Sequence, residues 1–144
     1  MTEIKSCAET EAEIEDEFSL FDDWMDKYSY IIDLSKELPP LDEKYRNDQF
    51  LIKGCQSQVW LGAEYRDGRV YFQADSDAII TKGLIYLLIR LLSDRTPQEI
   101  IEAQLESLKR IGISDNLSPS RSNGFANMLK QMKMYALVFQ TKEG

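Results

Sequence analysis

The chain contains two cysteines, Cys7 and Cys55, and no histidine. A cysteine or serine that attacks an acyl group is normally activated by a histidine, so the composition excludes Cys-His and Ser-His catalysis. A zinc site is nearly excluded as well, because two thiols and no imidazole supply too few ligands. Attack on the outer sulfur of a persulfide demands less, because no oxyanion forms and the rate depends on access and leaving-group pKa. Sulfur transfer is therefore open to a lone thiol in this chain.

Cys55 lies in a short polar stretch between two predicted strands. The stretch continues with Gln56, Ser57 and Gln58, whose small or amide side chains suit a loop held by hydrogen bonds. Gly54 precedes the cysteine and permits backbone angles that other residues resist. A thiol at such a loop tip can reach the active site of a partner protein. A lone cysteine without further context is more often a small buried apolar residue than a functional one.

Two cations could favour the thiolate form of Cys55. Lys53 lies two residues before it, and Arg121 lies far along the chain. No cluster of basic residues accompanies them and the net charge is -8, so a nucleic acid is not an expected partner. A partner protein that carries a basic patch fits this charge better.

The hydrophobic pattern predicts an α+β fold, with helices before and after a small antiparallel sheet of three strands. We expect helices over residues 11–21, 24–38, 78–92, 96–105 or 96–110, and 121–139, and a loop over residues 112–120. We expect strands over residues 49–53, 59–65 and 69–74. The second and third of these form a hairpin around a turn that contains Gly68. The helix over residues 78–92 is apolar almost all round, which predicts a central position.

The length of 144 residues suits one compact domain. We expect this domain to span residues 11–144, after a flexible tail at residues 1–10 that includes Cys7. No apolar run approaches the ~20 residues needed to cross a membrane. The acidic segment at residues 1–17 is unlike a signal peptide, so the expected location is the cytoplasm.

Four stretches of the sequence resemble, in order, motifs of the SufE family of sulfur acceptors. They are residues 28–34 with 38–39 (YSYIIDL, LP), 52–60 (IKGCQSQVW), 75–84 (DSDAIITKGL) and 117–124 (LSPSRSNG). The resemblance covers residues 24–136, nearly the whole expected domain. An ordered match in four parts is far more specific than a single Gly-Cys pair.

The resemblance implies that Cys55 receives sulfur as a persulfide from a SufS-type cysteine desulfurase, which speeds that enzyme's turnover. The sulfur then passes towards a SufBCD-type scaffold, where iron–sulfur clusters are built. Pyridoxal phosphate belongs to the desulfurase, so this chain is expected to hold no cofactor. It is also expected to bind no metal. We expect an accessory protein rather than an enzyme, present as a monomer or homodimer. The implied fold is shared with IscU-type scaffolds, and the thiol is sheltered in an apolar cavity until the partner docks.

The resemblance also suggests roles for residues outside the loop. Arg121 matches an arginine that lies near the loop in the family, where it could hold the loop, meet the partner, or simply anchor the last helix. Asp75 and Asp77 are acceptors for the start of a helix, or contact the partner together with Lys53. Asn116 stands where many family members carry a histidine.

One alternative to sulfur transfer is a binding protein that does not carry sulfur. The chain could activate a desulfurase, or respond to oxidants through Cys55, without moving sulfur. The third possibility, a scaffold on which clusters are assembled, needs several converging ligands, and one plausible thiolate without histidine argues against it.

Overall fold

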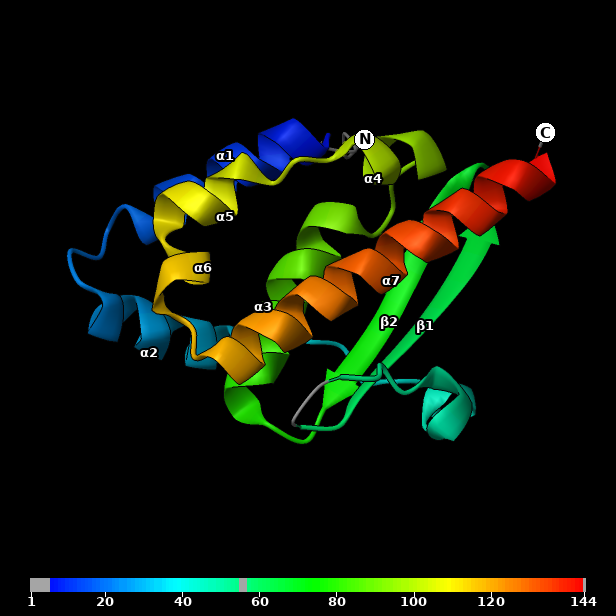
Figure 1. Ribbon diagram of the computed structural model, residues 1–144. Coiled ribbons are helices and arrows are strands. Elements are labelled where there is room, and N and C mark those ends of the chain that lie inside the picture. Colours follow the sequence, from blue (N-terminus) through cyan, green and yellow to red (C-terminus); the bar gives the residue numbers. More distant parts are fainter. Residues whose placement is uncertain (1–5, 55–56, 144) are drawn as a thin grey trace.

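The computed structural model describes residues 6–54 and 57–143, and its architecture is α+β, as predicted. The helices are α1 (Cys7–Phe18), α2 (Trp24–Leu34), α3 (Ile79–Leu92), α4 (Pro97–Glu102), α5 (Glu106–Ile111), α6 (Ile113–Asn116) and α7 (Pro119–Glu143). The strands are β1 (Val59–Arg66) and β2 (Arg69–Ser76), and short 3₁₀ helices lie at Ser35–Glu37, Glu43–Tyr45 and Asp48–Phe50. The long helix α7 crosses the front of the molecule, over α3 and the two strands (Figure 1).

The hairpin forms as predicted. β1 and β2 pair antiparallel from Val59 opposite Ser76 to Arg66 opposite Arg69. The two turn residues, Asp67 and Gly68, both have positive φ, at 51° and 80°. A two-residue turn of this kind matches the right-handed twist of the strands. Along β2, buried and half-buried side chains alternate, so one face of the hairpin packs on the core.

The third strand predicted over residues 49–53 does not form. Among the described residues the sheet has two strands, and Asp48–Phe50 is a 3₁₀ helix. The side chain of Asn47 caps this helix by accepting a hydrogen bond of 3.0 Å from the Gln49 N–H group, which turns the backbone away from the sheet. Only Leu51 then forms a bridge, to Trp60, beside a hydrogen bond of 2.8 Å from Ile52 N–H to the Val59 carbonyl.

Several helix boundaries also differ from the prediction. α1 begins at Cys7, inside the expected tail, because Ser6 and Glu9 form a capping box. The helix expected from residue 96 is interrupted where Leu105 adopts a left-handed conformation, so α4 and α5 are separate. The short helix α6 occupies part of the loop expected over residues 112–120. α7 starts at Pro119, where proline fits the first helical turn.

α3 lies at the centre of the molecule, as its apolar sequence predicted. It packs against α1, α2, β2 and α7, and eight of its residues are buried. Gly83 lets α2 come very close, because a Cβ atom there would lie 2.0 Å from the Ile31 carbonyl oxygen. In the part of the chain that the structure describes, no helix is long and apolar enough to cross a membrane.

Candidate functional site

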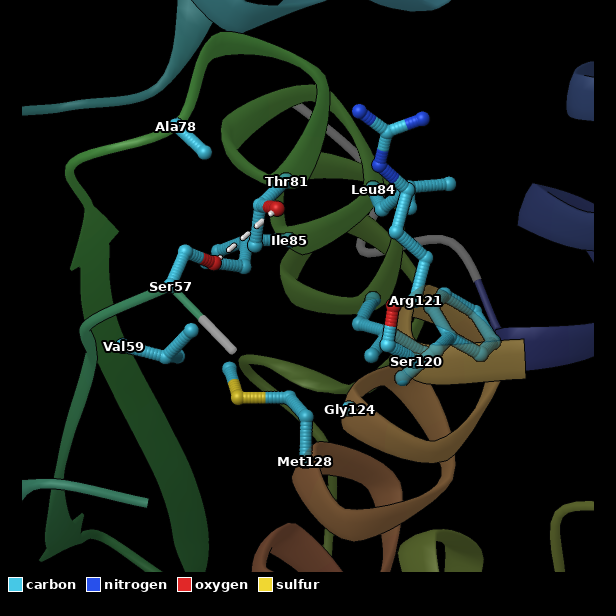
Figure 2. Close-up of a pocket in the computed structure, with 12 residues that line it drawn as sticks. Ser57, Val59, Ala78, Thr81, Leu84, Ile85, Ser120, Arg121, Gly124 and Met128 are labelled. Carbon is cyan, nitrogen blue, oxygen red and sulfur yellow. Dashed lines mark hydrogen bonds between the residues drawn. The ribbon is translucent and has the colours of Figure 1, made fainter. Parts of the chain in front are cut away.

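A cavity of about 250 Å³ lies between the start of β1, α3 and the first turns of α7. Its lining is mainly apolar, from Val59, Ala78, Leu84, Ile85, Leu88, Gly124, Phe125 and Met128. The polar lining residues are Ser57, Thr81, Ser120 and Arg121. Figure 2 shows these side chains arranged around the space between the start of β1 and the two helices. The cavity can therefore hold a small apolar or sulfur-containing group beside a few polar ones.

Cys55 and Gln56 lie outside the described residues, so their predicted roles remain predictions. The structure does place the residues on both sides of them. On the N-terminal side, the Asn127 Nδ2 atom of α7 donates a hydrogen bond of 3.3 Å to the Lys53 carbonyl. Gly54 has φ +86°, and a Cβ atom there would lie 2.5 Å from the same Nδ2 atom. This end of the segment thus favours glycine and is tied to α7.

On the C-terminal side, the chain is tied to the start of α3. The Gln58 N–H group donates to Asp77 Oδ1 at 3.0 Å, and the Asp77 N–H group donates to the Gln58 carbonyl at 3.3 Å. The hydroxyl groups of Ser57 and Thr81 lie 3.4 Å apart, within hydrogen-bonding distance. The two ends of the Cys55 segment are therefore anchored to α7 and α3, the two helices that wall the cavity.

Ser57 and Arg121, both predicted as supporting residues, line the same cavity. Arg121 is exposed, and in Figure 2 its side chain extends away from Met128. The start of α7 has its own cap, because the Arg121 N–H group donates to the Ser118 hydroxyl at 3.4 Å. Arg121 therefore brings a positively charged side chain to the edge of the cavity, with its guanidinium group extending away from Met128.

Asp75 lies outside the cavity and is engaged within the chain. Arg46 donates to it at 2.7 Å, Lys82 lies 3.5 Å away, and the Ser76 N–H group donates at 2.8 Å. Partial burial opposes ionisation of Asp75, but the hydrogen bonds from Arg46 and Ser76 and the charge of Lys82 outweigh it and lower the pKa of the carboxyl group. Arg46 also covers the Trp60 ring, 4.9 Å from its centre.

The structure gives Asp77 a local role, since it pairs with Gln58 and not with the helix-start N–H groups. The Ala78 N–H group instead donates a hydrogen bond to the Ser76 hydroxyl at 3.2 Å. Lys53 is exposed. Asn116 is exposed and donates to the Gly112 carbonyl at 2.7 Å. It does not line the cavity.

Cys7 is part of α1 and half-buried, not part of a tail. Burial raises the pKa of its thiol, and the nearby Glu11 raises it further, while Arg95 acts in the opposite direction. The raised pKa keeps this thiol protonated at neutral pH, which makes it a poor nucleophile.

Asn127 is the residue that sequence reasoning missed. It lies 74 positions after Lys53. Gly54 signals an unusual backbone angle, but no local pattern identifies the side chain that comes so close to it. Only the packing of α7 against the loop reveals the pair.

Comparison with known proteins identifies the family of the chain. The sequence matches the family described as "SufE: Fe-S metabolism associated domain" over residues 12–136. An uncharacterised SufE-like protein of Synechocystis is 38% identical over 129 residues, which cover 90% of this chain and 81% of that protein. The chain therefore belongs to the SufE family.

The fold has a solved counterpart. The solution structure of a hypothetical protein from Thermus thermophilus superposes with a TM-score of 0.76, covering 92% of this chain and 96% of the other. The sequence identity is 16%, so this likeness concerns the fold alone.

Proposed function

We propose that this protein accepts sulfur on Cys55, as a persulfide, from a SufS-type cysteine desulfurase, and delivers it for iron–sulfur cluster assembly. The observation that carries the proposal is the apolar cavity walled by the same two helices that anchor the ends of the Cys55 segment. Ser57, two residues after the cysteine, lines that cavity. Membership of the SufE family supports the proposal independently.

The chemistry needs no base from this chain. The Cys55 thiolate attacks the outer sulfur of the donor persulfide, and a new sulfur–sulfur bond forms as the donor's own sulfur–sulfur bond breaks. The transferred sulfur keeps its proton, and the donor cysteine leaves as a thiolate. Charge and oxidation state are thus conserved across the two proteins, and no further oxidant or reductant is needed.

The electrostatics of the cavity suit an anionic sulfur. Of the described residues that line it, none is acidic, and Arg121 contributes a positive charge. A nearby cation lowers the pKa of a thiol and increases the thiolate fraction. We therefore assign Arg121 to stabilising the thiolate or persulfide, or to meeting the partner.

The remaining parts of the proposal follow from the family. The desulfurase supplies the pyridoxal phosphate chemistry, while this chain works as an accessory protein. Removing sulfur from the desulfurase speeds its turnover, and a SufBCD-type scaffold receives the sulfur. The cytoplasm is the compartment we expect for these steps.

The test is sulfur loading followed by intact-protein mass spectrometry. After incubation with a SufS-type desulfurase and free cysteine, wild-type protein should gain the mass of one sulfur atom, which a reducing agent removes. Cys55→Ser should gain nothing, whereas the matched control Cys7→Ser should load like wild type. If Cys55→Ser still accelerated the desulfurase as well as wild type does, the protein would be an activator that does not carry sulfur.

A further inference from the structure

Two hollows lie along the outward face of α7, and the exposed residues Lys130 and Met134 line both of them. One hollow, of about 420 Å³, is lined by Ile101, Ala126, Leu129, Lys130, Lys133, Met134 and Leu137. The other, of about 380 Å³, lies between α7 and the segment before Cys55, and its lining includes Lys53, Asn127, Lys130, Gln131 and Met134. Neither hollow shares a residue with the cavity beside the Cys55 segment.

Along this face, α7 exposes apolar side chains. Met134 is 48% exposed, and Leu137 and Val138 are each 46% exposed. The inner face of α7 has its own apolar residues, such as Met128 and Met132, which are buried. α7 is thus apolar on two faces although the described structure covers only one, and such an exposed apolar surface is typical of an interaction site.

The charge of this surface is opposite to that of the whole chain. The sequence has 25 acidic and 17 basic residues, yet among the described residues that line the two hollows there are three lysines and no acidic residue. Lys133 is held in place by donating to the Ile101 and Ala103 carbonyls, at 3.4 and 2.6 Å. Lys53 and Lys130 are exposed and form no ion pair with any residue in the described ranges.

We propose that this face of α7 binds an acidic amphipathic helix of a partner protein. Apolar side chains of that helix would enter the two hollows, and its carboxylates would pair with the lysines at their edges. The surface from residue 127 to residue 138 extends about 16 Å at 1.5 Å per residue, which suits roughly three turns of a bound helix. Its length and its two separate hollows favour a polypeptide over a small molecule.

The surface adjoins the anchored end of the Cys55 segment. Lys53 and Asn127, which hydrogen-bond to each other, both line the second hollow. A helix bound there would contact this anchor without touching the described residues that line the cavity. The net charge of -8 predicts a partner with a basic patch, so the reversed sign of this face marks it as a separate docking surface.

The test is an NMR titration of ¹⁵N-labelled protein with designed helical peptides. One peptide carries leucine at helical spacing with glutamate between, and the other has lysine in place of each glutamate. We expect the acidic peptide to shift the amide signals of Lys53 and of residues 127–138, and the basic peptide to leave them unchanged. Lys130→Glu should weaken binding of the acidic peptide about tenfold, and Met134→Gln should weaken it without changing the charge.

Lys109→Glu is the matched control, because Lys109 is exposed on α5 beside α1, on another side of the molecule (Figure 1). It makes the same change in net charge and should leave binding unchanged. Thermal unfolding of each variant checks that the fold is intact.

The proposal is wrong if the basic peptide binds as well as the acidic one, or if the acidic peptide shifts signals away from α7. It is equally wrong if vesicles of phosphatidylglycerol bind this face and the acidic peptide does not. None of these results depends on sulfur transfer by Cys55.

Discussion

The α1 side of the molecule and the segment around Cys55 are held in place by different interactions. On the α1 side, Arg90 of α3 forms a bidentate ion pair with Glu17, in which Nη1 lies 2.9 Å from Oε1 and Nη2 contacts Oε2. The Tyr30 hydroxyl donates to the same carboxylate at 2.6 Å. Arg95, 5% exposed, donates to the Thr10 hydroxyl at 2.8 Å. Charged and partly buried hydrogen bonds thus tie α1 to the centre of the fold.

The ends of the Cys55 segment have much weaker ties. Asn127 contributes one neutral hydrogen bond at 3.3 Å, and the hydroxyls of Ser57 and Thr81 lie 3.4 Å apart. Among the described residues at these two ends, Asp77 adds a charged acceptor. Regions with few and weak contacts open at a lower free-energy cost than the core does. The difference suggests that the α1 contacts contribute more to the stability of the fold than the described contacts at the two ends of the Cys55 segment do.

Arg90→Ala should produce the largest loss of stability. It removes the bidentate partner of Glu17, whose side chain is 30% exposed, and leaves that carboxylate facing Tyr30 alone. We expect the free energy of unfolding to fall by about 2 kcal/mol, the range for hydrogen bonds to charged groups. Urea unfolding measures this change, and sulfur loading of the folded protein should stay at the wild-type level. A loading defect as large as the stability defect would remove the distinction between the two regions.

Gly54→Ala should have a smaller effect on stability and a much larger one on function. Alanine at φ +86° costs about 1 kcal/mol, and its Cβ atom would displace the Asn127 side chain. Gly68→Ala is the matched control, because Gly68 has φ +80° with nothing near its Cβ position. Both variants should lose similar stability in urea, but only Gly54→Ala should slow sulfur loading. Equal loading rates would show that the geometry at Gly54 does not matter for transfer.

Asn127→Ala should change stability least among the three substitutions. It removes one hydrogen bond, worth about 1 kcal/mol or less, yet it frees the Lys53 end of the Cys55 segment. Asn123→Ala controls for helix propensity, since Asn123 is exposed on the same helix. We expect faster hydrogen exchange at Lys53 and Gly54 in Asn127→Ala only. Unchanged exchange would mean that the contact does not hold the segment.

Local sequence signals predicted much of this fold. The hairpin was recognisable from its alternation and its Asp67-Gly68 turn, and α3 from its continuous apolar run. The capping box at Ser6 and Glu9 was also present in the sequence, but it lies ahead of the apolar pattern used to place the first helix, so α1 was predicted to start too late. The third strand was wrongly predicted because a single capping side chain, Asn47, redirects the backbone.

The candidate site was only partly predictable, because it depends on contacts between distant segments. Cys55, Ser57 and Arg121 could be selected from their motifs, and the structure brings Ser57 and Arg121 to one cavity. Asp75 carries the same motif signal, yet its ion pairs with Arg46 and Lys82 place it elsewhere. The pairing of Asn127 with Lys53 has no local signature, since it arises from where α7 crosses the loop.

Alkaline pH should weaken the hydrogen bond between Tyr30 and Glu17 and so slightly lower the free energy of unfolding. This dependence on pH distinguishes the hydrogen bond of Tyr30 from the packing of its ring. Partial burial, then the hydrogen bond to Glu17, raises the pKa of Tyr30 to about 12. The unfolded chain releases this proton near pH 10, so the folded state loses the Tyr30 contribution as the pH rises from about 10 to 12, and keeps it in full below that range.

Tyr30→Phe retains the ring, which packs edge-on against Phe18, but removes the titrating group. The stability advantage of wild type over Tyr30→Phe, measured by urea unfolding, should therefore be constant below pH 10 and shrink above it. An advantage that stayed constant up to pH 12 would show that the phenol does not contribute through its proton, and that Arg90 alone holds Glu17 in place.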